Sequence, residues 1–296
     1  MGVCTDTRIA ELTSGGRQVL ELKTSEGKLL QAFAGDSITQ EIQARGEYDG
    51  NTLDSLRQIL PVIRPRASLD VGANIGNHAV VIADYSEKLI AFEPVPFIFD
   101  LLKQNFDRNG LHHAHAVNIG LSNETMHRDI FIPEYGNLGC SSLEPIEAEG
   151  THVQIETWVG DDYLAKNYPE KQIDFIKIDV EGHEPAALAG LVDTLTKHQP
   201  LILMEYRNKS TLALFQDRTL FWRLFPGYRI YSLSNTASKK VYPPGLIGIL
   251  RRWVAKLQGG HWCLSDFDAL RRYSNIYLVP KRYQILFAGL RYLSSK

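Results

Sequence analysis

The segment Asp70-Val71-Gly72-Ala73-Asn74-Ile75-Gly76 is the basis of the fold prediction. It follows the apolar run Ala67–Val71 and precedes Asn77–Tyr85, which has the pattern of a helix. A glycine-rich turn between a strand and a helix is typical of ligand-binding α/β sheets, because glycine lets the backbone turn tightly and approach a ligand. The dinucleotide fingerprint needs a middle glycine where this chain has Asn74. The turn is therefore interpreted as binding an adenosyl ligand without a pyrophosphate. The alternative is that it serves strand-to-helix geometry alone.

Short apolar runs recur along the chain with helical segments or loops between them. Such runs suit strands buried on both faces of a parallel sheet, and their alternation with helices indicates right-handed βαβ units. We therefore predict a doubly wound α/β fold with a mostly parallel sheet and an antiparallel strand next to the edge at Tyr273–Val279. The predicted parallel strands are Ala67–Val71, Lys88–Phe92, Ala114–Ile119, Ile173–Ile178 and Leu201–Met204, and the predicted helices are 77–85, 97–109 and 185–197.

The region before the glycine turn predicts a small extension. Apolar and polar residues alternate over Gln18–Phe33 around a turn signal, as in a β-hairpin. We expect this hairpin to be an edge element or a lid over the site. Asn51 or Thr52 is placed to cap a helix that Pro61 ends. We expect an N-terminal extension over 1–50 and a ligand-binding domain over 51–296, with an amphipathic insertion at about 240–265.

Composition excludes several classes of protein. The 296 residues are 44% hydrophobic and 22% charged, which is ordinary globular usage. The net charge of -2 provides no general attraction to nucleic acid. The three cysteines show no disulfide framework or zinc-ligand spacing. Without a signal-peptide pattern or a long apolar span, the chain is expected to be cytoplasmic.

A carboxylate ends the second predicted strand. Glu93 follows the glycine turn by about twenty residues, where related folds place an acid on the ribose hydroxyls. A carboxylate accepts hydrogen bonds from both hydroxyls of a diol, and its charge strengthens each bond. Glu93 is the predicted ribose ligand, and a surface glutamate at a strand end is the alternative.

The fourth predicted strand ends in Lys177-Ile178-Asp179-Val180-Glu181-Gly182-His183-Glu184-Pro185. Crowded acids raise one another's pKa and are typical of functional sites. Asp179 and Glu181 should face the reacting group, and His183 is a candidate general base. Glu184 also suits the first turn of a helix, where negative charge is favourable.

A metal site is a further alternative. Asp179 and Glu205 end adjacent predicted strands and offer hard oxygens suited to Mg²⁺. Two carboxylates form only a minimal site, so a divalent metal is possible without being expected. The dispersed His78, His112, His113 and His115 lack metal-ligand spacing with an acid partner and are interpreted as surface or packing residues.

These motifs together resemble the FkbM-type methyltransferase family. The resemblance covers about Tyr48 to Arg207 and rests on Asp70–Gly76, Phe92-Glu93-Pro94, Ile176–Gly182 and Glu205. Asn137–Ser142 is also similar to the family's polar loop after the third strand. The chain departs from the family at Trp158-Val159-Gly160-Asp161-Asp162, so neither aspartate is given a role.

The resemblance implies a class I methyltransferase fold that binds S-adenosylmethionine, releases S-adenosylhomocysteine and methylates hydroxyl groups. Implied acceptors are sugars, glycans, lipopolysaccharide or other glycolipids, and natural products. The glycine turn would hold the methionyl end, and the loop after the third strand would border the adenine. The expected cofactor-binding residues are Asp70, Gly72, Asn74, Gly76, Glu93, Ile119, Leu121, Ser122 and Asp179, and the expected catalytic residues are Asp179, Glu181 and His183.

An amphipathic segment, Pro244–Leu257, lies outside these motifs. Its apolar residues share one helical face, while Arg251, Arg252 and Lys256 cluster away from that face. It suits a peripheral membrane contact or a lid over a lipid-linked acceptor. A helix packed on the domain or in a homo-oligomer interface is the commoner use of such a pattern.

Two other functions share the predicted fold. A nicotinamide-dependent oxidoreductase would use the same ribose acid but needs the three-glycine fingerprint. A noncatalytic binding protein on a methyltransferase scaffold is the other alternative, because fold does not determine function. An N-methyltransferase acting on protein or RNA is disfavoured, since the chain has no basic stripe.

Overall fold

The computed structural model describes residues 8–14, 16–133, 150–216, 223–236, 249, 251, 253–254, 261–269, 271 and 273–293. The polar loop at Asn137–Ser142 lies outside these residues, as does most of the amphipathic segment. No helix in the described part of the chain is long and apolar enough to span a bilayer.

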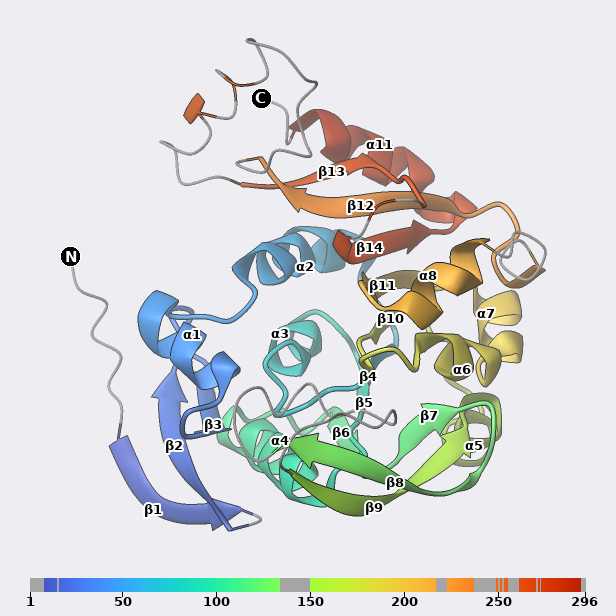
Figure 1. Cartoon of the computed structure of the whole chain (residues 1–296). Helices are drawn as coiled ribbons and strands as arrows, with labels where there is room; N and C mark the ends of the chain where they lie inside the picture. Colours follow the sequence, from blue (N-terminus) through green and yellow to red (C-terminus); the bar gives the residue numbers. More distant parts are fainter. Residues whose placement is uncertain are drawn as a thin grey trace.

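An eight-stranded sheet forms the centre of the molecule, in the order β13-β12-β14-β11-β10-β4-β5-β6 (Figure 1). The five strands from β11 to β6 are parallel, as the apolar runs predict, and all residues of β4, β5, β10 and β11 are buried. This is the doubly wound arrangement expected of a class I methyltransferase. The parallel strands are β4 (Ser68–Val71), β5 (Leu89–Phe92), β6 (Ala114–Val117), β10 (Phe175–Ile178) and β11 (Leu201–Tyr206).

Helices cover both faces of this sheet (Figure 1). Side chains alternate along a strand, so each parallel strand contributes to two hydrophobic cores. One core contains α2 (Gly50–Ile63), α3 (Ala79–Asp84), α4 (Pro96–Arg108) and α11 (Gln284–Leu293). The other contains α5 (Gly160–Asn167), α6 (Glu184–Ala189), α7 (Val192–His198) and α8 (Lys209–Gln216).

Two smaller sheets flank the central one. The predicted hairpin is present as β2 (Arg17–Lys23) and β3 (Leu29–Phe33), and β1 (Arg8–Ser14) adds a third strand before α1 (Ser37–Arg45). The second small sheet has the order β7-β9-β8. It consists of β7 (Gly120–Ser122), β8 (Met126–Pro133) and β9 (Gly150–Val159).

Two local predictions are wrong at helix boundaries. The N-cap of α2 is Asp49 rather than Asn51 or Thr52, and the helix passes Pro61 to end at Ile63. The predicted helix over 185–197 is two helices, α6 and α7, separated near Gly190. A Cβ at Gly190 would lie 1.9 Å from the carbonyl oxygen of Ser122, so close packing against β7 requires glycine where the helix breaks.

The antiparallel end of the sheet is larger than predicted. β14 (Tyr273–Val279) is antiparallel to β11, as expected, but two further strands lie beyond it. These are β12 (Arg229–Asn235) and β13 (Trp262–Asp266), so β13 rather than β14 forms the outer edge. The short 3-10 helix Lys281–Tyr283 then joins β14 to α11.

Candidate functional site

The turn after β4 begins the wall of a cavity at the carboxyl edge of the parallel strands. Gly72, Asn74 and Gly76 have positive φ angles of 80°, 50° and 91°. A Cβ at Gly72 would lie 1.9 Å from the carbonyl oxygen of Asp179, so glycine lets the loops after β4 and β10 touch. Gly72 and Asn74 line the cavity. Gly76 does not, and a Cβ there would lie 2.8 Å from Leu102 of α4, so it serves helix packing.

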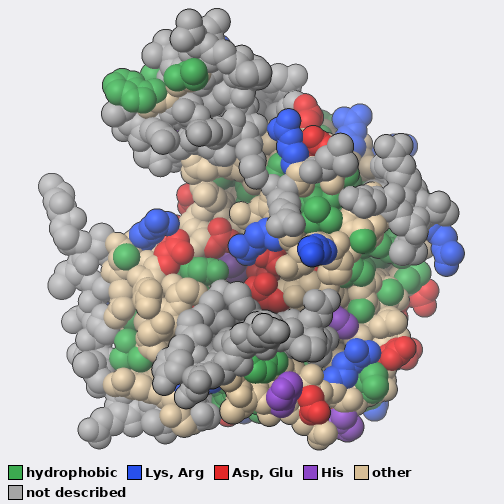
Figure 2. All heavy atoms as spheres, in the orientation of Figure 1, with side chains coloured by type: hydrophobic (Ala, Val, Ile, Leu, Met, Phe, Trp, Pro, Cys, Tyr) green, Lys and Arg blue, Asp and Glu red, His purple; other side chains and the backbone are tan. Residues whose placement is uncertain are grey.

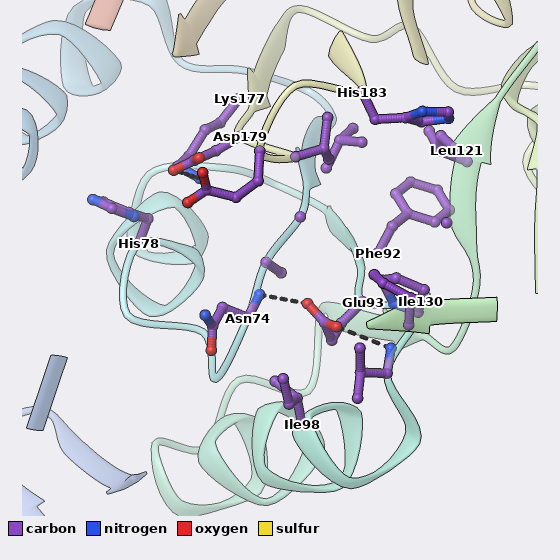
Figure 3. A pocket seen from close by; sticks show the side chains of 18 of the residues that line it. Asn74, His78, Phe92, Glu93, Ile98, Leu121, Ile130, Lys177, Asp179 and His183 are labelled. Carbon is purple, nitrogen blue, oxygen red and sulfur yellow. Dashed lines mark hydrogen bonds and ion pairs between the residues drawn. The ribbon is translucent and has the colours of Figure 1, made fainter. Parts of the chain in front are cut away.

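Glu93 lines the cavity and is only 6% exposed (Figure 3). Its Oε2 accepts a hydrogen bond of 2.9 Å from the backbone N–H of Asn74, and its Oε1 accepts one of 2.9 Å from that of Val95. Burial raises the pKa of the carboxyl to about 7, although these two hydrogen bonds stabilise the ionised form and lower the pKa. Each oxygen keeps a lone pair for a further donor, which suits the two hydroxyls of a ribose.

A buried lysine separates two acids at the polar end of the cavity. The Lys177 Nζ lies 3.4 Å from Asp70 Oδ1 and 3.3 Å from Asp179 Oδ2. Burial opposes the charge on Lys177, but the two carboxylates outweigh it and raise the pKa of the amine, which stays protonated. Lys177 and Asp179 line the cavity (Figure 3). Asp70 is fully buried behind them and does not line it, so its observed role is to pair with Lys177.

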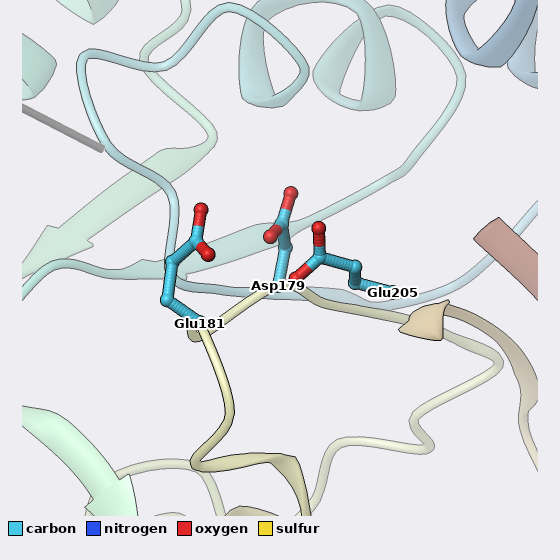
Figure 4. A group of neighbouring side chains, drawn as sticks. All are labelled: Asp179, Glu181 and Glu205. Atoms are coloured by element: carbon cyan, nitrogen blue, oxygen red, sulfur yellow. The ribbon is translucent and has the colours of Figure 1, made fainter. Parts of the chain in front are cut away.

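Three carboxylates meet beside this end, as Figure 4 shows. One oxygen from each of Asp179, Glu181 and Glu205 lies within 4.8 Å of the others. Burial and the charges of Asp179 and Glu181 raise the pKa of Glu205 to about 8. Glu205 also accepts hydrogen bonds from Arg207 Nε at 2.6 Å and Asn208 Nδ2 at 3.2 Å. The group has the hard oxygen donors that Mg²⁺ prefers, and Arg207 already supplies it with a cation.

A buried glutamate holds the acidic turn in place. Glu184 is fully buried, and its Oε1 accepts hydrogen bonds from the backbone N–H groups of Val180 at 3.1 Å and Gly182 at 3.2 Å. Thr211 donates to its other oxygen. Glu184 therefore begins α6 and also orders the turn that presents Asp179 and Glu181.

The opposite end of the cavity is apolar and contains His183 (Figure 3). Phe92, Leu121 and Ile130 line this end. The His183 Nε2 lies 3.0 Å from the hydroxyl of Ser122. Burial, aided by Arg128, lowers the pKa of His183, so the ring is neutral at neutral pH.

Seven of the sequence-predicted site residues line one cavity: Gly72, Asn74, Glu93, Leu121, Asp179, Glu181 and His183. The loop after β6 differs from the prediction in two positions. Ile119 is 6% exposed and Ser122 is fully buried, and neither lines the cavity. Side chains alternate along β7, so Leu121 faces the cavity while Ser122 points to His183.

His78 and Tyr48 are among the cavity residues that the sequence analysis does not assign to the site. His78 was interpreted as a surface or packing residue, but it is 8% exposed, lines the cavity and places Nε2 3.5 Å from Asp49 Oδ2. Tyr48 lines the cavity from the N-terminal extension, and burial together with Asp49 and Asp179 raises its pKa to about 12. His78 directly follows the glycine turn, two residues after Gly76, and this adjacency is the sequence signal that could have found it. Tyr48 has no such signal, because only the fold brings it to the cavity.

The two aspartates to which the family pattern gives no role, Asp161 and Asp162, differ in their contacts. Asp161 accepts hydrogen bonds from the backbone N–H groups of Asp193 at 2.7 Å and Thr194 at 2.9 Å. These are orphan donors in the first turn of α7, so Asp161 caps that helix from a distant segment. Asp162 is exposed.

Comparisons with known proteins match this chain to methyltransferases. The model of the Methyltransferase FkbM domain matches residues 70–225. The chain is 34% identical over 135 residues to the hexuronic acid methyltransferase AglP of Haloferax volcanii, which is 43% of this chain and 50% of that protein. It is 29% identical over 155 residues to the methyltransferase sdnD of Sordaria araneosa, and this match covers 42% of this chain and 59% of that protein. The matches span roughly half the length of these relatives.

Solved methyltransferases are more distant. An FkbM methyltransferase from Methylobacillus flagellatus gives a TM-score of 0.43 at 17% identity, with 72% of this chain and 43% of that chain covered. An O-methyltransferase from Bacillus cereus gives a TM-score of 0.43 at 13% identity, with 80% of this chain and 84% of that chain covered. The family model matches more than half of the residues and includes the glycine turn, Glu93 and the acidic turn. The chain belongs to the FkbM methyltransferase family.

Proposed function

We propose that this protein transfers a methyl group from S-adenosylmethionine to an oxygen atom of a sugar, a glycan or a natural product. The observation that carries the proposal is Glu93, a buried carboxylate with free lone pairs in the wall of a cavity built on the glycine turn. Family membership supports methyl transfer, and the hexuronic acid methyltransferase among the relatives supports a sugar acceptor.

Along the sheet edge, the cavity residues after β4, β5 and β6 follow one another in the same order as the methionyl, ribose and adenine parts of the cofactor. When bound, S-adenosylmethionine supplies an electrophilic methyl group on a sulfonium. Gly72 and Asn74 would hold its methionyl end, Glu93 would accept hydrogen bonds from the ribose hydroxyls, and Leu121 would border the adenine. The expected contribution of this binding is alignment, which can lower a two-substrate barrier by about 7–11 kcal/mol in well-oriented systems.

A hydroxyl acceptor must lose a proton as its oxygen attacks. Asp179 and Glu181 lie at the polar end of the cavity, and we propose that one of them takes this proton. His183 is the third candidate, but its ring lies at the apolar end beside Leu121 (Figure 3). This position favours the two carboxylates over His183 as the base.

We also propose the domain organisation that the sequence predicts. Residues 1–50 form an extension and 51–296 the methyltransferase domain, with an insertion at about 240–265. The extension contributes Ile38 and Tyr48 to the cavity wall, so it belongs to the same functional unit.

Calorimetry with S-adenosylhomocysteine tests the cofactor assignment. Glu93→Ala should weaken binding roughly 10- to 100-fold, the weight of one or two charge-assisted hydrogen bonds. Glu87→Ala is the matched control, because Glu87 is an exposed acid at the other end of the same strand region. Failure of the parent protein to bind S-adenosylhomocysteine, or equal affinity in Glu93→Ala, would reject the assignment.

Transfer of tritiated methyl groups to a panel of glycosides, including p-nitrophenyl glucuronide, tests the acceptor. Base-stable product on a sugar hydroxyl supports ether formation, whereas base-labile product indicates a methyl ester on a carboxylate. Cofactor binding without transfer to any acceptor would favour a binding protein.

A further inference from the structure

A hydrogen bond to Ser122 determines which ring nitrogen of His183 carries a proton. His183 directly follows the segment that resembles the family, Ile176–Gly182, and its Nε2 lies 3.0 Å from the hydroxyl oxygen of Ser122. Ser122 is fully buried, and its hydroxyl donates to Asn123 Oδ1 at 3.2 Å. A serine hydroxyl has a single proton, so the proton in the bond to His183 must come from the ring.

The ring therefore keeps its proton on Nε2 and a lone pair on Nδ1. Burial, aided by Arg128, lowers the pKa of His183, so the ring carries a single proton at neutral pH. A neutral imidazole has one donor nitrogen and one acceptor nitrogen. Nδ1 forms no hydrogen bond with any residue that the structure describes, and it is not sealed in the interior. Because the ring lines the cavity, this lone pair is available to a bound ligand (Figure 3).

The walls around His183 suit a flat heteroaromatic ring. Charged side chains gather in the middle of the face that Figure 2 shows, whereas this end of the cavity is apolar. Its lining includes Phe92 of β5 together with Leu121, Ile130 and Ile155, one each from β7, β8 and β9. Apolar side chains can bury the faces of such a ring, and a few polar groups then recognise its edge.

Adenine has one kind of donor on its edge, the exocyclic amino group, whereas its unsubstituted ring nitrogens are acceptors. An acceptor nitrogen such as Nδ1 of His183 therefore matches the amino group and no other atom of the base. We propose that His183 recognises the adenine of the cofactor, with Nδ1 accepting a hydrogen bond from the amino group. Ser122 and Asn123 are positioning residues, because their hydrogen bonds keep the proton on Nε2.

The inference rests on the proposed function, since it requires an adenosyl ligand in this cavity. It assigns His183 to the cofactor and leaves the acceptor to the carboxylates at the polar end. S-inosylhomocysteine differs from S-adenosylhomocysteine by an oxygen in place of the amino group and a proton on the neighbouring ring nitrogen. That oxygen would bring a lone pair against the lone pair of Nδ1, and a site built for a donor rejects a ligand that lacks it.

Calorimetry with these two ligands tests the proposal. The parent protein should bind S-adenosylhomocysteine roughly 30-fold more tightly than S-inosylhomocysteine. His183→Phe keeps an aromatic ring but removes Nδ1, so it should reduce this ratio to about threefold or less. Ser122→Ala should also reduce the ratio, because Nδ1 can then carry the proton and donate to the inosyl oxygen. Both ligands are measured on the same variant, so a partial loss of folded protein does not change the ratio.

His112→Phe is the matched control, because His112 is exposed and does not line the cavity. It should keep both affinities, and Glu93→Ala should weaken both ligands by the same factor. Equal weakening of both ligands by His183→Phe would show a packing role and overturn the proposal, as would equal affinities in the parent.

Nitrogen-15 NMR of the histidine rings reads the proton position directly. The His183 signals should show the proton on Nε2, and a proton on Nδ1 would overturn the proposal. Failure of the parent to bind S-adenosylhomocysteine would instead reject the proposed function, and this inference with it. Binding of S-adenosylhomocysteine without discrimination against S-inosylhomocysteine would reject the inference alone.

Discussion

Gly72 shows how one residue couples two loops of the site. Its φ of 80° is in the left-handed region, and a Cβ there would lie 1.9 Å from the carbonyl oxygen of Asp179. The cavity therefore depends on the absence of a side chain at this position. Strain and steric overlap both arise if one is added.

Gly72→Ala should lower the free energy of unfolding by about 3 kcal/mol or more, because the added methyl group overlaps backbone. Gly227→Ala is the control: its φ of 75° is similar, but a Cβ there meets no atom within 4 Å, so about 1 kcal/mol of strain is expected. Denaturant titration measures both. Equal losses would show that the loop contact does not matter.

The raised pKa of Glu93 makes cofactor binding depend on pH. Ribose hydroxyls donate to the ionised carboxylate, whose pKa in the free protein is about 7. Affinity for S-adenosylhomocysteine should therefore rise roughly tenfold from about pH 6 to about pH 8. Calorimetry across this range measures it, and Glu93→Gln should show no such rise. An affinity that falls with pH would contradict the assignment.

The raised pKa of Glu93 makes the stability of the fold fall as pH rises, whereas cofactor affinity rises. Glu93 holds its proton in the folded state up to about pH 7, whereas in the unfolded chain the carboxyl has its ordinary pKa of 4.5. The unfolded state thus binds fewer protons within this window, and the contribution of Glu93 to stability is lost as pH rises through it.

We expect no tight metal binding at Asp179, Glu181 and Glu205. Lys177 pairs with Asp179 and Arg207 with Glu205, so cations of the protein already offset part of the negative charge. Titration calorimetry with Mg²⁺ should give weak or no binding, and a chelator should not change methyl transfer. Tight Mg²⁺ binding that Asp179→Asn abolishes would contradict this expectation.

Among the secondary-structure elements, α7 depends on a cap from another part of the chain. Helix N-termini leave four N–H groups without partners, and Asp161, which begins α5 with Gly160, accepts from two of them. The cap thereby ties α5 to α7 on one face of the sheet.

Asp161→Ala should cost about 1 kcal/mol of stability, within the usual range for loss of an N-cap. Asp162→Ala, at the exposed neighbouring position, should change it by less than about 0.5 kcal/mol. Thermal or urea unfolding of the two variants makes the comparison. A larger loss for Asp162→Ala would show that the wrong aspartate has been identified as the cap.

Across the molecule as a whole, the N-terminal extension is joined to the methyltransferase domain by buried hydrogen bonds. Asn105 of α4 is fully buried, and its Oδ1 accepts from the Gln31 N–H at 2.6 Å. Its Nδ2 donates to the carbonyls of Gln31 at 3.0 Å and Ile75 at 2.7 Å. One side chain thus links β3, α4 and the glycine turn, which supports a fixed wall rather than a mobile lid.

Asn105→Asp should cost about 2–4 kcal/mol, because it leaves two buried carbonyls without donors. It should also weaken S-adenosylhomocysteine binding through the glycine turn. Asn109→Asp is the control, since Asn109 makes the same pair of bonds to Leu29 one helical turn later in a half-buried position. Separate unfolding transitions for the extension and the domain would contradict the coupling.

The parallel sheet, the glycine turn and the carboxylates at the strand ends can all be predicted from the amino-acid sequence alone. These are local features: burial on both faces selects continuous apolar runs, and a tight turn selects glycine. The carboxyl ends of parallel strands share one edge, so the order of the motifs is enough to predict that Glu93 and Asp179 lie together.

Which neighbours of these residues face the cavity depends instead on tertiary packing. His78 and Asp49 are 29 residues apart, and Tyr48 enters from an extension whose pattern says nothing about the site. Gly190 breaks a helix because β7 packs on it, and Ser122 turns from the cavity to His183. Local sequence carries periodicity and turn chemistry, whereas these placements depend on contacts between distant segments, which exist only once the chain has packed.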